Sequence, residues 1–216
     1  TPEEIINKTD AIDLDFLLED LPRMIASMNL GIERISDIMQ SLRNFSRKDA
    51  TQRKSVDIHQ GIDTTLMILS HRLKANELHP KIEVSKKYGD LPKIECFPGQ
   101  LNQVFMNLLA NAIDVLEEKA QKDKDFVPKI SISTKLVNNN SVKISVADNG
   151  NGIPEEVKNQ LFDAFFTTKP EGKGTGLGLS ISYQIITGTH DGTLECFSGK
   201  GEGTEFVIEI PVSIRE

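Results

Sequence analysis

Apolar side chains recur in alternating steps of four and three residues between positions 21 and 42, which predicts a helix with a heptad seam. The seam positions are Leu21, Ile25, Met28, Ile32, Ile35, Met39 and Leu42. Asp20 can cap this helix, and Pro22 is tolerated in its first turn. Further apolar residues, such as Met24 and Ile38, widen the stripe, which favours a bundle of several helices. This face therefore needs a partner, either another segment of the protein or another chain.

A polar segment, "RKDATQRKSVD" at residues 47–57, follows this helix and is typical of a linker. Asp57 followed by Gln60 resembles a capping box and predicts a helix over about 57–76. "KIEVSKKY" and "KIECF" predict short strands on either side of the turn "GDLP". A long amphipathic helix is predicted for "PGQLNQVFMNLLANAIDVLEEKAQK". Its apolar side carries Leu101, Val104, Phe105, Leu108, Leu109, Ala112, Ile113 and Leu116.

The second half of the chain predicts strands joined in hairpins. "KISISTKLV" and "SVKISVAD" alternate apolar and polar residues and are joined by "NNN". We expect a short helix after Pro154, a helix around 176–188, and a closing antiparallel pair formed by "GTLECFS" and "TEFVIEIP". This mixture predicts an α+β two-layer sandwich, one mixed sheet with helices on one face, preceded by the long heptad helix. We expect the helical region to occupy residues 1–50 and the sandwich domain residues 51–216.

Composition and charge narrow the function classes. The 216 residues carry 25 Lys and Arg against 32 Asp and Glu, a net charge of −7, which argues against nucleic-acid partners and anionic membranes. No apolar run is long enough to span a bilayer, so we expect no membrane contact. Cys96 and Cys196 stand in no metal or redox spacing and are expected to be buried free thiols, which fits the cytoplasm. The acidic, polar start without Met predicts a piece of a longer protein.

Three glycine-rich stretches follow in order: "DNGNG" (148–152), "GKGTGLG" (172–178) and "GKGEGT" (199–204). Neither Gly-Lys pair has the earlier glycine and the following Ser or Thr that a P-loop requires. No predicted strand leads directly into a G-x-G-x-x-G pattern, which excludes a dinucleotide-binding fingerprint. Taken singly, such loops are weak indications of function, because many connections between elements carry several glycines.

The predicted amphipathic helix carries two amides on its apolar side. Asn107 and Asn111 are four residues apart and therefore share one helix face. Amides in such surroundings are costly unless something hydrogen-bonds to them. They are either buried asparagines bonded to backbone or the lining of a site for a polar ligand or metal. An Asn carbonyl oxygen is a hard ligand suited to Mg²⁺, which keeps waters and phosphate oxygens as its other ligands.

The ordered motifs "NLLANA", "DNGNG", "FDAFFTTK", "GTGLGLS" and "GEGT" resemble the N, G1, F, G2 and G3 boxes of the sensor histidine kinase catalytic domain. This domain belongs to the GHKL ATP-binding superfamily with the Bergerat fold. The preceding helix, ending in "LRNFSR", is similar to the second helix of a dimerisation and phosphoacceptor domain. The "NAID" variant and the short lid resemble the nitrogen-regulator-like branch and cyanobacterial kinases.

The resemblance implies ATP and Mg²⁺ as cofactors and assigns roles to individual residues. Asn111 would hold Mg²⁺ against the phosphates, and Asn107 would contact the phosphates one turn away. Asp148 would accept the adenine amine, while Gly150 and Gly152 would let the backbone approach the base. Further nucleotide contacts are implied for Phe165, Lys169, Gly174, Thr175, Gly176, Leu177, Gly178 and Thr204. Phe165 and Phe166 would anchor a lid over the triphosphate, and Lys169 would reach its terminal phosphates.

The resemblance also implies what lies outside this sequence. His59, His71, His79 and His190 have no family phosphoacceptor context, so we expect the phosphorylated histidine on a helix upstream of residue 1. The implied partners are that helix, a second copy of the chain in a homodimer, and the receiver domain of a response regulator. Superfamily ATPases place a glutamate base at the position of Asn107, and an amide cannot accept a proton at neutral pH, which favours kinase over hydrolase. The alternatives are a regulatory nucleotide-binding module without transfer activity and another GHKL ATPase.

Overall fold

The heptad helix is described only in part. The computed structural model describes residues 52–76, 79–169, 174–199 and 201–213, together with residues 18, 20–22, 24–25 and 28. The described positions between 18 and 28 are helical, and Leu21, Ile25 and Met28 of the seam are 54%, 50% and 63% exposed. The seam positions from Ile32 onward lie outside the described residues. The boundary at residue 50 and the partner of this face therefore stay predictions.

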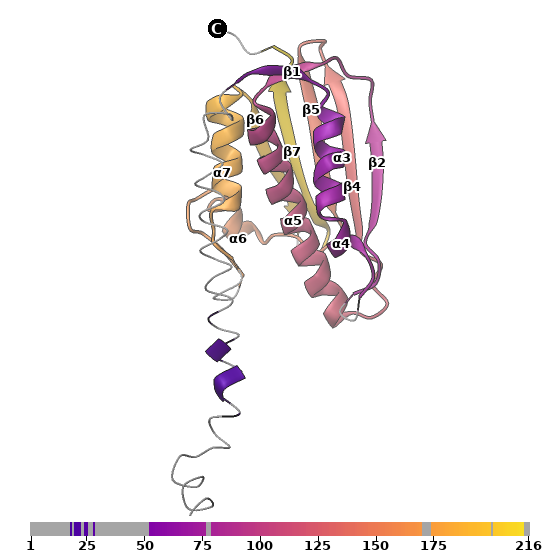
Figure 1. The fold of residues 1–216 in the computed structure, drawn as a ribbon, viewed down its shortest axis with the longest axis vertical. Helices are drawn as coiled ribbons and strands as arrows, with labels where there is room; N and C mark the ends of the chain where they lie inside the picture. The colour runs from indigo at the N-terminus through magenta and orange to yellow at the C-terminus, as the bar shows by residue number, and fades with distance from the viewer. Residues whose placement is uncertain are drawn as a thin grey trace, which may run out of the picture.

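A five-stranded sheet forms one layer of the domain, in the order β2-β4-β5-β7-β6 (Figure 1). The strands are β2 (Glu83–Tyr88), β4 (Lys129–Val137), β5 (Ser141–Asp148), β6 (Thr193–Gly199) and β7 (Gly203–Pro211). β2 pairs with β4 in parallel, and the other pairs are antiparallel. The sheet is therefore mixed, as the sequence predicts.

Helices cover one face of this sheet and form the second layer (Figure 1). They are α3 (Ile58–Ile68), the short α4 (Ser70–Leu73), α5 (Pro98–Lys122), α6 (Glu155–Lys158), and α7 (Gly178–Gln184), which continues as the π-helix η2 (Ile185–Thr189). All eight apolar residues predicted for the buried side of α5 are buried. They pack against a row of sheet residues such as Ile132, Val146 and Phe206, which are paired across β4, β5 and β7. The predicted α+β two-layer sandwich is confirmed.

Turn chemistry explains why the β4–β5 hairpin is read correctly from the sequence. Asn138 and Asn139 adopt positive φ angles of 50° and 57°, a conformation that Asn tolerates better than most residues. The cysteine expectation is also met in the main: Cys96 is buried, Cys196 is half-buried, and both are free. Burial raises the pKa of each thiol to about 11, so both remain protonated at neutral pH.

Several local predictions are wrong at the start of the domain. Residues 54–56 form a strand, β1 (Lys54–Val56), inside the segment predicted as a linker. β1 pairs antiparallel with β3 (Ile94–Cys96), so the two predicted strands around "GDLP" belong to different sheets. This pairing is long-range and leaves no periodic signal in three residues.

One predicted helix is shorter than expected, and another has the expected length but changes its geometry near the middle. The helix predicted over 57–76 is interrupted at Leu69 and ends at Leu73. Asp57 does cap it, but its carboxylate accepts from the N–H of His59, and no reciprocal bond from Gln60 closes a capping box. The helix predicted around 176–188 begins at Gly178 and changes to π geometry at Ile185.

Candidate functional site

One side of α5 faces the start of α7, the lid and the "DNG" loop. Asn107, Asn111, Val115 and Lys119 are spaced by four residues and therefore form a row along the helix. We call these four residues the α5 row. Asn107 contacts the start of α7, Asn111 contacts Lys169 of the lid, and Val115 and Lys119 both lie against the "DNG" loop. A helix of this length thus aligns segments that are far apart in the sequence.

Asn107 contacts the start of α7. Its amide nitrogen donates to the carbonyl oxygen of Gly178 at 2.9 Å and to the hydroxyl oxygen of Ser182 at 3.2 Å. Ser182 is fully buried and also donates to the Gly178 carbonyl at 2.8 Å. The nitrogen of Asn107 is bonded to protein, as expected of a buried asparagine. These contacts leave its oxygen available, as expected of a residue that lines a site for a polar ligand.

Asn111 contacts the predicted lid, residues 165–178, of which residues 170–173 lie outside the described residues. The Lys169 ammonium donates to the Asn111 amide oxygen at 3.0 Å and to a carboxylate oxygen of Asp114 at 2.5 Å. The other carboxylate oxygen of Asp114 accepts from the Arg72 guanidinium at 2.6 Å. Two oxygens from α5 thus converge on one cation.

Asp148 is the last residue of β5 and is followed in the loop by Gly150, which lies against Val115, the third member of the row. One carboxylate oxygen accepts from the N–H of Gly150 at 2.8 Å, and a Cβ on Gly150 would lie 2.4 Å from a methyl carbon of Val115. Burial raises the pKa of Asp148 above its ordinary range, while the backbone N–H groups of Gly150 and Thr204 and the charge of Lys119 act in the opposite direction. A desolvated carboxylate at this position is suited to accept from an N–H donor of a ligand.

Lys119, the last member of the row, donates hydrogen bonds to the backbone of the "DNG" loop. Its ammonium donates to the carbonyl oxygens of Asn149 and Gly150, each at 2.9 Å. The Asn149 side chain bonds to the backbone at the start of β4. It accepts from the N–H of Lys129 at 2.8 Å and donates to the Val127 carbonyl at 2.9 Å. Lys119 and Asp114 are not among the residues predicted for the site, although their spacing from Asn107 along the helix could have indicated both.

Backbone packing explains the remaining glycines of the loop. Gly152 has a φ of +71°, and a Cβ on it would lie 1.9 Å from the Gly199 carbonyl oxygen. The loop therefore packs directly on the β6–β7 turn. Thr204 is buried at the start of β7, pairs with Asp148 across the ladder, and lies 3.2 Å from the Ser198 hydroxyl. The backbone N–H of Thr204 lies beside the Asp148 carboxylate, and its nucleotide contact stays a prediction.

At Phe165 the described part of the lid is held by the backbone rather than by the aromatic ring, whereas Phe166 is half-buried. Phe165 is 74% exposed, so its ring does not anchor the lid as the resemblance implied. Its N–H donates to the Gly176 carbonyl instead. A Cβ on Gly174 would lie 2.6 Å from the Thr167 hydroxyl and 3.2 Å from Lys169 Cβ, and the Thr175 hydroxyl accepts from Leu177 N–H at 3.4 Å.

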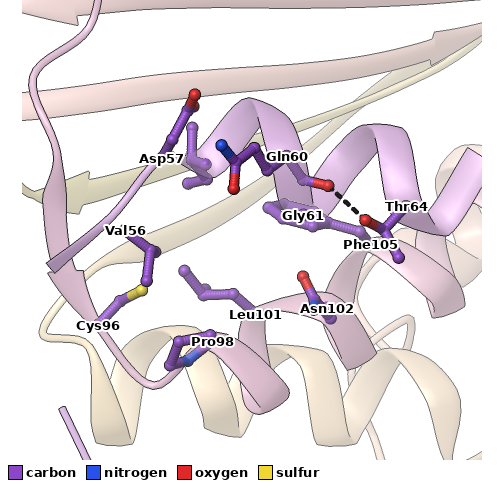
Figure 2. A pocket seen from close by; sticks show the side chains of 11 residues that line it. Val56, Asp57, Gln60, Gly61, Thr64, Cys96, Pro98, Leu101, Asn102 and Phe105 are labelled. Atoms are coloured by element: carbon purple, nitrogen blue, oxygen red, sulfur yellow. Dashed lines mark hydrogen bonds between the residues drawn. The ribbon is translucent and has the colours of Figure 1, made fainter. Parts of the chain in front are cut away.

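A separate pocket of about 220 Å³ lies between α3, β1 and the start of α5, and includes none of the predicted site residues (Figure 2). Asn102 and Gly61 face one another across it, and a Cβ on Gly61 would lie 2.5 Å from the Asn102 amide oxygen. Asn102 shows that an amide on α5 need not belong to the α5 row.

The four histidines take structural positions. His59 in α3 stacks on Tyr88 at 4.2 Å, and His71 is exposed in α4. His79 is buried, and its two ring nitrogens lie 2.7 Å from the Pro80 carbonyl and 2.9 Å from the Asn76 amide. His190 is buried and accepts from the N–H of Phe97, the residue before α5. Among the described residues, no hydrogen bond or ion pair joins any of these histidines to the α5 row.

The described ranges hold neither a metal-binding cluster nor a membrane-spanning helix. No cluster of three or more His, Cys, Asp or Glu side chains there could hold a metal ion by itself. A magnesium ion bound together with phosphate oxygens does not require such a cluster. No helix in the same part of the chain is both long and apolar enough to cross a membrane.

The fold defines a class of domain: a mixed sheet covered by helices, with a long helix set against glycine-rich loops. Residues 97–214 match the family described as "Histidine kinase-, DNA gyrase B-, and HSP90-like ATPase", and the chain belongs to this family. Together with the relatives named below, this match confirms the resemblance to the catalytic domain of sensor histidine kinases. The assignment to a nitrogen-regulator-like or cyanobacterial branch stays a prediction.

Named relatives and a solved structure agree with this membership. The chain is 32% identical to Sporulation kinase E of Bacillus subtilis over 84% of its length, and 32% identical to Sensor kinase CckA of Brucella abortus over 89%. It spans only 23% and 20% of those two proteins. The nucleotide-free catalytic domain of histidine kinase ThkA superimposes with a TM-score of 0.63 at 28% identity, covering 76% of this chain and 97% of that one.

Proposed function

We propose that this chain is the ATP-binding catalytic part of a sensor histidine kinase. It transfers the γ-phosphoryl group of ATP to a histidine upstream of residue 1, from which the group passes to an aspartate of a response regulator. The family and its named relatives support the class of reaction. The contacts of the α5 row carry the proposal for this chain, because one helix face reaches α7, the lid and the "DNG" loop in succession.

The row also orients the nucleotide. The Asp148 carboxylate lies at the Lys119 end and accepts the exocyclic amine of adenine, where guanine would present a carbonyl. The backbone of Gly150 and Gly152 lies beside the base, with Thr204 next to Asp148. The triphosphate then extends toward Asn111 and Asn107, where Lys169, Gly174, Thr175, Gly176, Leu177 and Gly178 meet it.

The residues around Asn111 fit a magnesium ion. The Asn111 amide oxygen already accepts from the Lys169 ammonium at 3.0 Å, so this corner presents an oxygen ligand to a cation. Oxygen ligands are what Mg²⁺ prefers, and Asn111 would hold it together with phosphate oxygens and water. When bound, the ion neutralises phosphate charge during transfer. The triphosphate itself is bound by Asn107 and Asn111, the lid backbone and Lys169 together.

Transfer to a histidine is favoured over hydrolysis at this site. A hydrolase needs a base that takes a proton from water, and Asn107 has no such capacity at neutral pH. Its nitrogen instead donates to Gly178 and Ser182, which fixes the start of α7 beside the phosphates. The chain's share in catalysis is therefore positioning and charge neutralisation, and ATP turnover without an acceptor is slow.

The partners follow from this reaction. The phosphoacceptor helix comes from the same protein upstream, and the heptad face between residues 21 and 42 pairs in a homodimer. A receiver domain takes the phosphoryl group, and the reaction takes place in the cytoplasm. We include neither nucleic acid nor a membrane surface among the partners, because the net charge of −7 is unfavourable for both.

The test is to incubate the chain with γ-labelled ATP, Mg²⁺ and a dimerisation and phosphoacceptor domain from a close relative. We expect label on the acceptor histidine, little release of free phosphate, and loss of both ATP binding and label in Asn111→Ala. An acceptor with its histidine replaced by glutamine is the control. ATP binding without any label on a competent acceptor would favour a regulatory module, and rapid hydrolysis abolished by Asn107→Ala would favour an ATPase.

A further inference from the structure

Asp114 connects two cationic side chains that come from different elements. One carboxylate oxygen accepts from Arg72 of α4 at 2.6 Å, and the other accepts from Lys169 of the lid at 2.5 Å. Arg72 also binds Glu117 at 2.7 Å, so the guanidinium is held between two acids of α5. Because Arg72 holds one oxygen, the second Asp114 oxygen is turned toward the lid.

The position of the lysine is informative because the same ammonium also contacts Asn111. It lies 3.0 Å from the amide oxygen that would hold Mg²⁺ under the proposed function. An ammonium and a divalent cation repel each other, so they cannot both stay at this oxygen. Binding of the magnesium nucleotide therefore requires Lys169 to leave Asn111.

We propose that Asp114 is a positioning residue for Lys169, which it holds at the cation position of Asn111 until the magnesium nucleotide takes that position. This inference rests on the proposed function, because it needs Asn111 to receive Mg²⁺. Lys169 is then released toward the phosphates, while Asp114 retains its bond to Arg72. The lid residue thus exchanges one anionic partner, a carboxylate, for another, the triphosphate.

The energetic expectation is modest, since the three side chains involved are only partly buried. The exposed fractions are 27% for Arg72, 33% for Asp114 and 31% for Lys169. Partly exposed ion pairs contribute little free energy, so releasing Lys169 should change nucleotide affinity by about two- to fivefold. A change of this size is measurable by calorimetric titration.

The experiment is titration of the chain with a non-hydrolysable ATP analogue in saturating Mg²⁺. We expect Asp114→Asn to raise affinity by about two- to fivefold, because the bound lysine no longer competes. Lys169→Met should lower affinity, because a phosphate contact is lost. In the Lys169→Met background, Asp114→Asn should change affinity no more than the control does. With Lys169 present, Asp114→Glu keeps the carboxylate and should bind the nucleotide as the wild type does.

Glu118→Gln is the matched control, since it removes one negative charge from α5 and breaks a 2.5 Å ion pair with Lys122 outside the row. An equal gain from Asp114→Asn with and without Lys169 would mean plain charge repulsion and would overturn the proposal. A loss of affinity would also overturn it, because Asp114 would then bind the nucleotide complex directly. If the wild-type chain binds no nucleotide, the proposed function fails first.

Discussion

The N–H of Phe165 donates to the carbonyl oxygen of Gly176 at 2.9 Å, and both residues have positive φ angles, 67° and 66°. This bond joins the two ends of the lid. A positive φ at a phenylalanine is strained by about 1–2 kcal/mol, so the surrounding contacts must hold it there. The close approach of the Gly176 backbone is one such contact, because a side chain would not fit between the two residues.

Replacing Gly176 with alanine should open this end of the lid. A Cβ on Gly176 would lie 2.3 Å from the carbonyl carbon of Phe165, which is too close, and φ would also be strained. We expect loss of most nucleotide affinity in calorimetric titration, with the melting temperature lowered by only a few degrees. Gly201→Ala is the control, because its φ is +85° but its Cβ meets nothing within 4 Å. Equal nucleotide affinities in the two variants would contradict the role of the contact.

How far the sequence predicts the fold depends on how local each signal is. The buried side of α5 and the Asn138–Asn139 turn follow from periodicity and backbone preference, which act within a few residues. The strand β1 does not, because its three residues are stabilised by pairing with β3, about 40 residues further along. The interruption at Leu69 likewise has no breaker residue to announce it.

The site residues that depend on local signals could also be predicted, and those that depend on long-range packing could not. Asn107 and Asn111 were found because two amides on an apolar helix face are unusual and the helix itself is plainly predicted. Arg72 could not be found, because its bond to Asp114 depends on how α4 lies against α5. Phe165 was misread, since motif order predicts an aromatic residue at the lid but not whether the ring or the backbone makes the contact.

Asn111→Ala should strongly weaken binding of the magnesium nucleotide with the fold retained. Its amide is half-buried, and its recorded contact is with Lys169, so few native interactions are lost. We expect at least a tenfold loss of affinity, about 1.4 kcal/mol, and circular dichroism melting close to wild type. Asn102→Ala removes an amide from the same helix outside the α5 row and should leave affinity unchanged. Wild-type affinity in Asn111→Ala would contradict the magnesium role.

Asp148→Asn should weaken adenine binding without unfolding the domain. Burial raises the pKa of Asp148, which means that folding penalises its charged form. An uncharged amide at this position removes that penalty. The free energy gained in this way offsets the hydrogen bonds that the carboxylate loses. Nucleotide affinity of the wild type should fall as pH is lowered through this raised pKa, beginning at a higher pH than for an ordinary aspartate of 3.8. Titrations from pH 7.5 downward check both effects. Asp148→Asn should lack the step, and simple unfolding of this variant would show that the carboxylate is structural.

His190 provides a test of the fold that is independent of nucleotide. Its Nδ1 donates to the Ile185 carbonyl at 2.9 Å, and its Nε2 accepts from Phe97 N–H at 3.1 Å, which requires the neutral ring. Burial lowers the pKa of His190 below the ordinary 6.5, so the unfolded state takes up a proton first and stability falls as pH drops below about 6.5. His190→Ala should cost about 1–3 kcal/mol at pH 7.5 and less at pH 5.5 in urea denaturation. The exposed His71→Ala should change neither value by much, and a His190→Ala cost independent of pH would show that the ring is not held neutral.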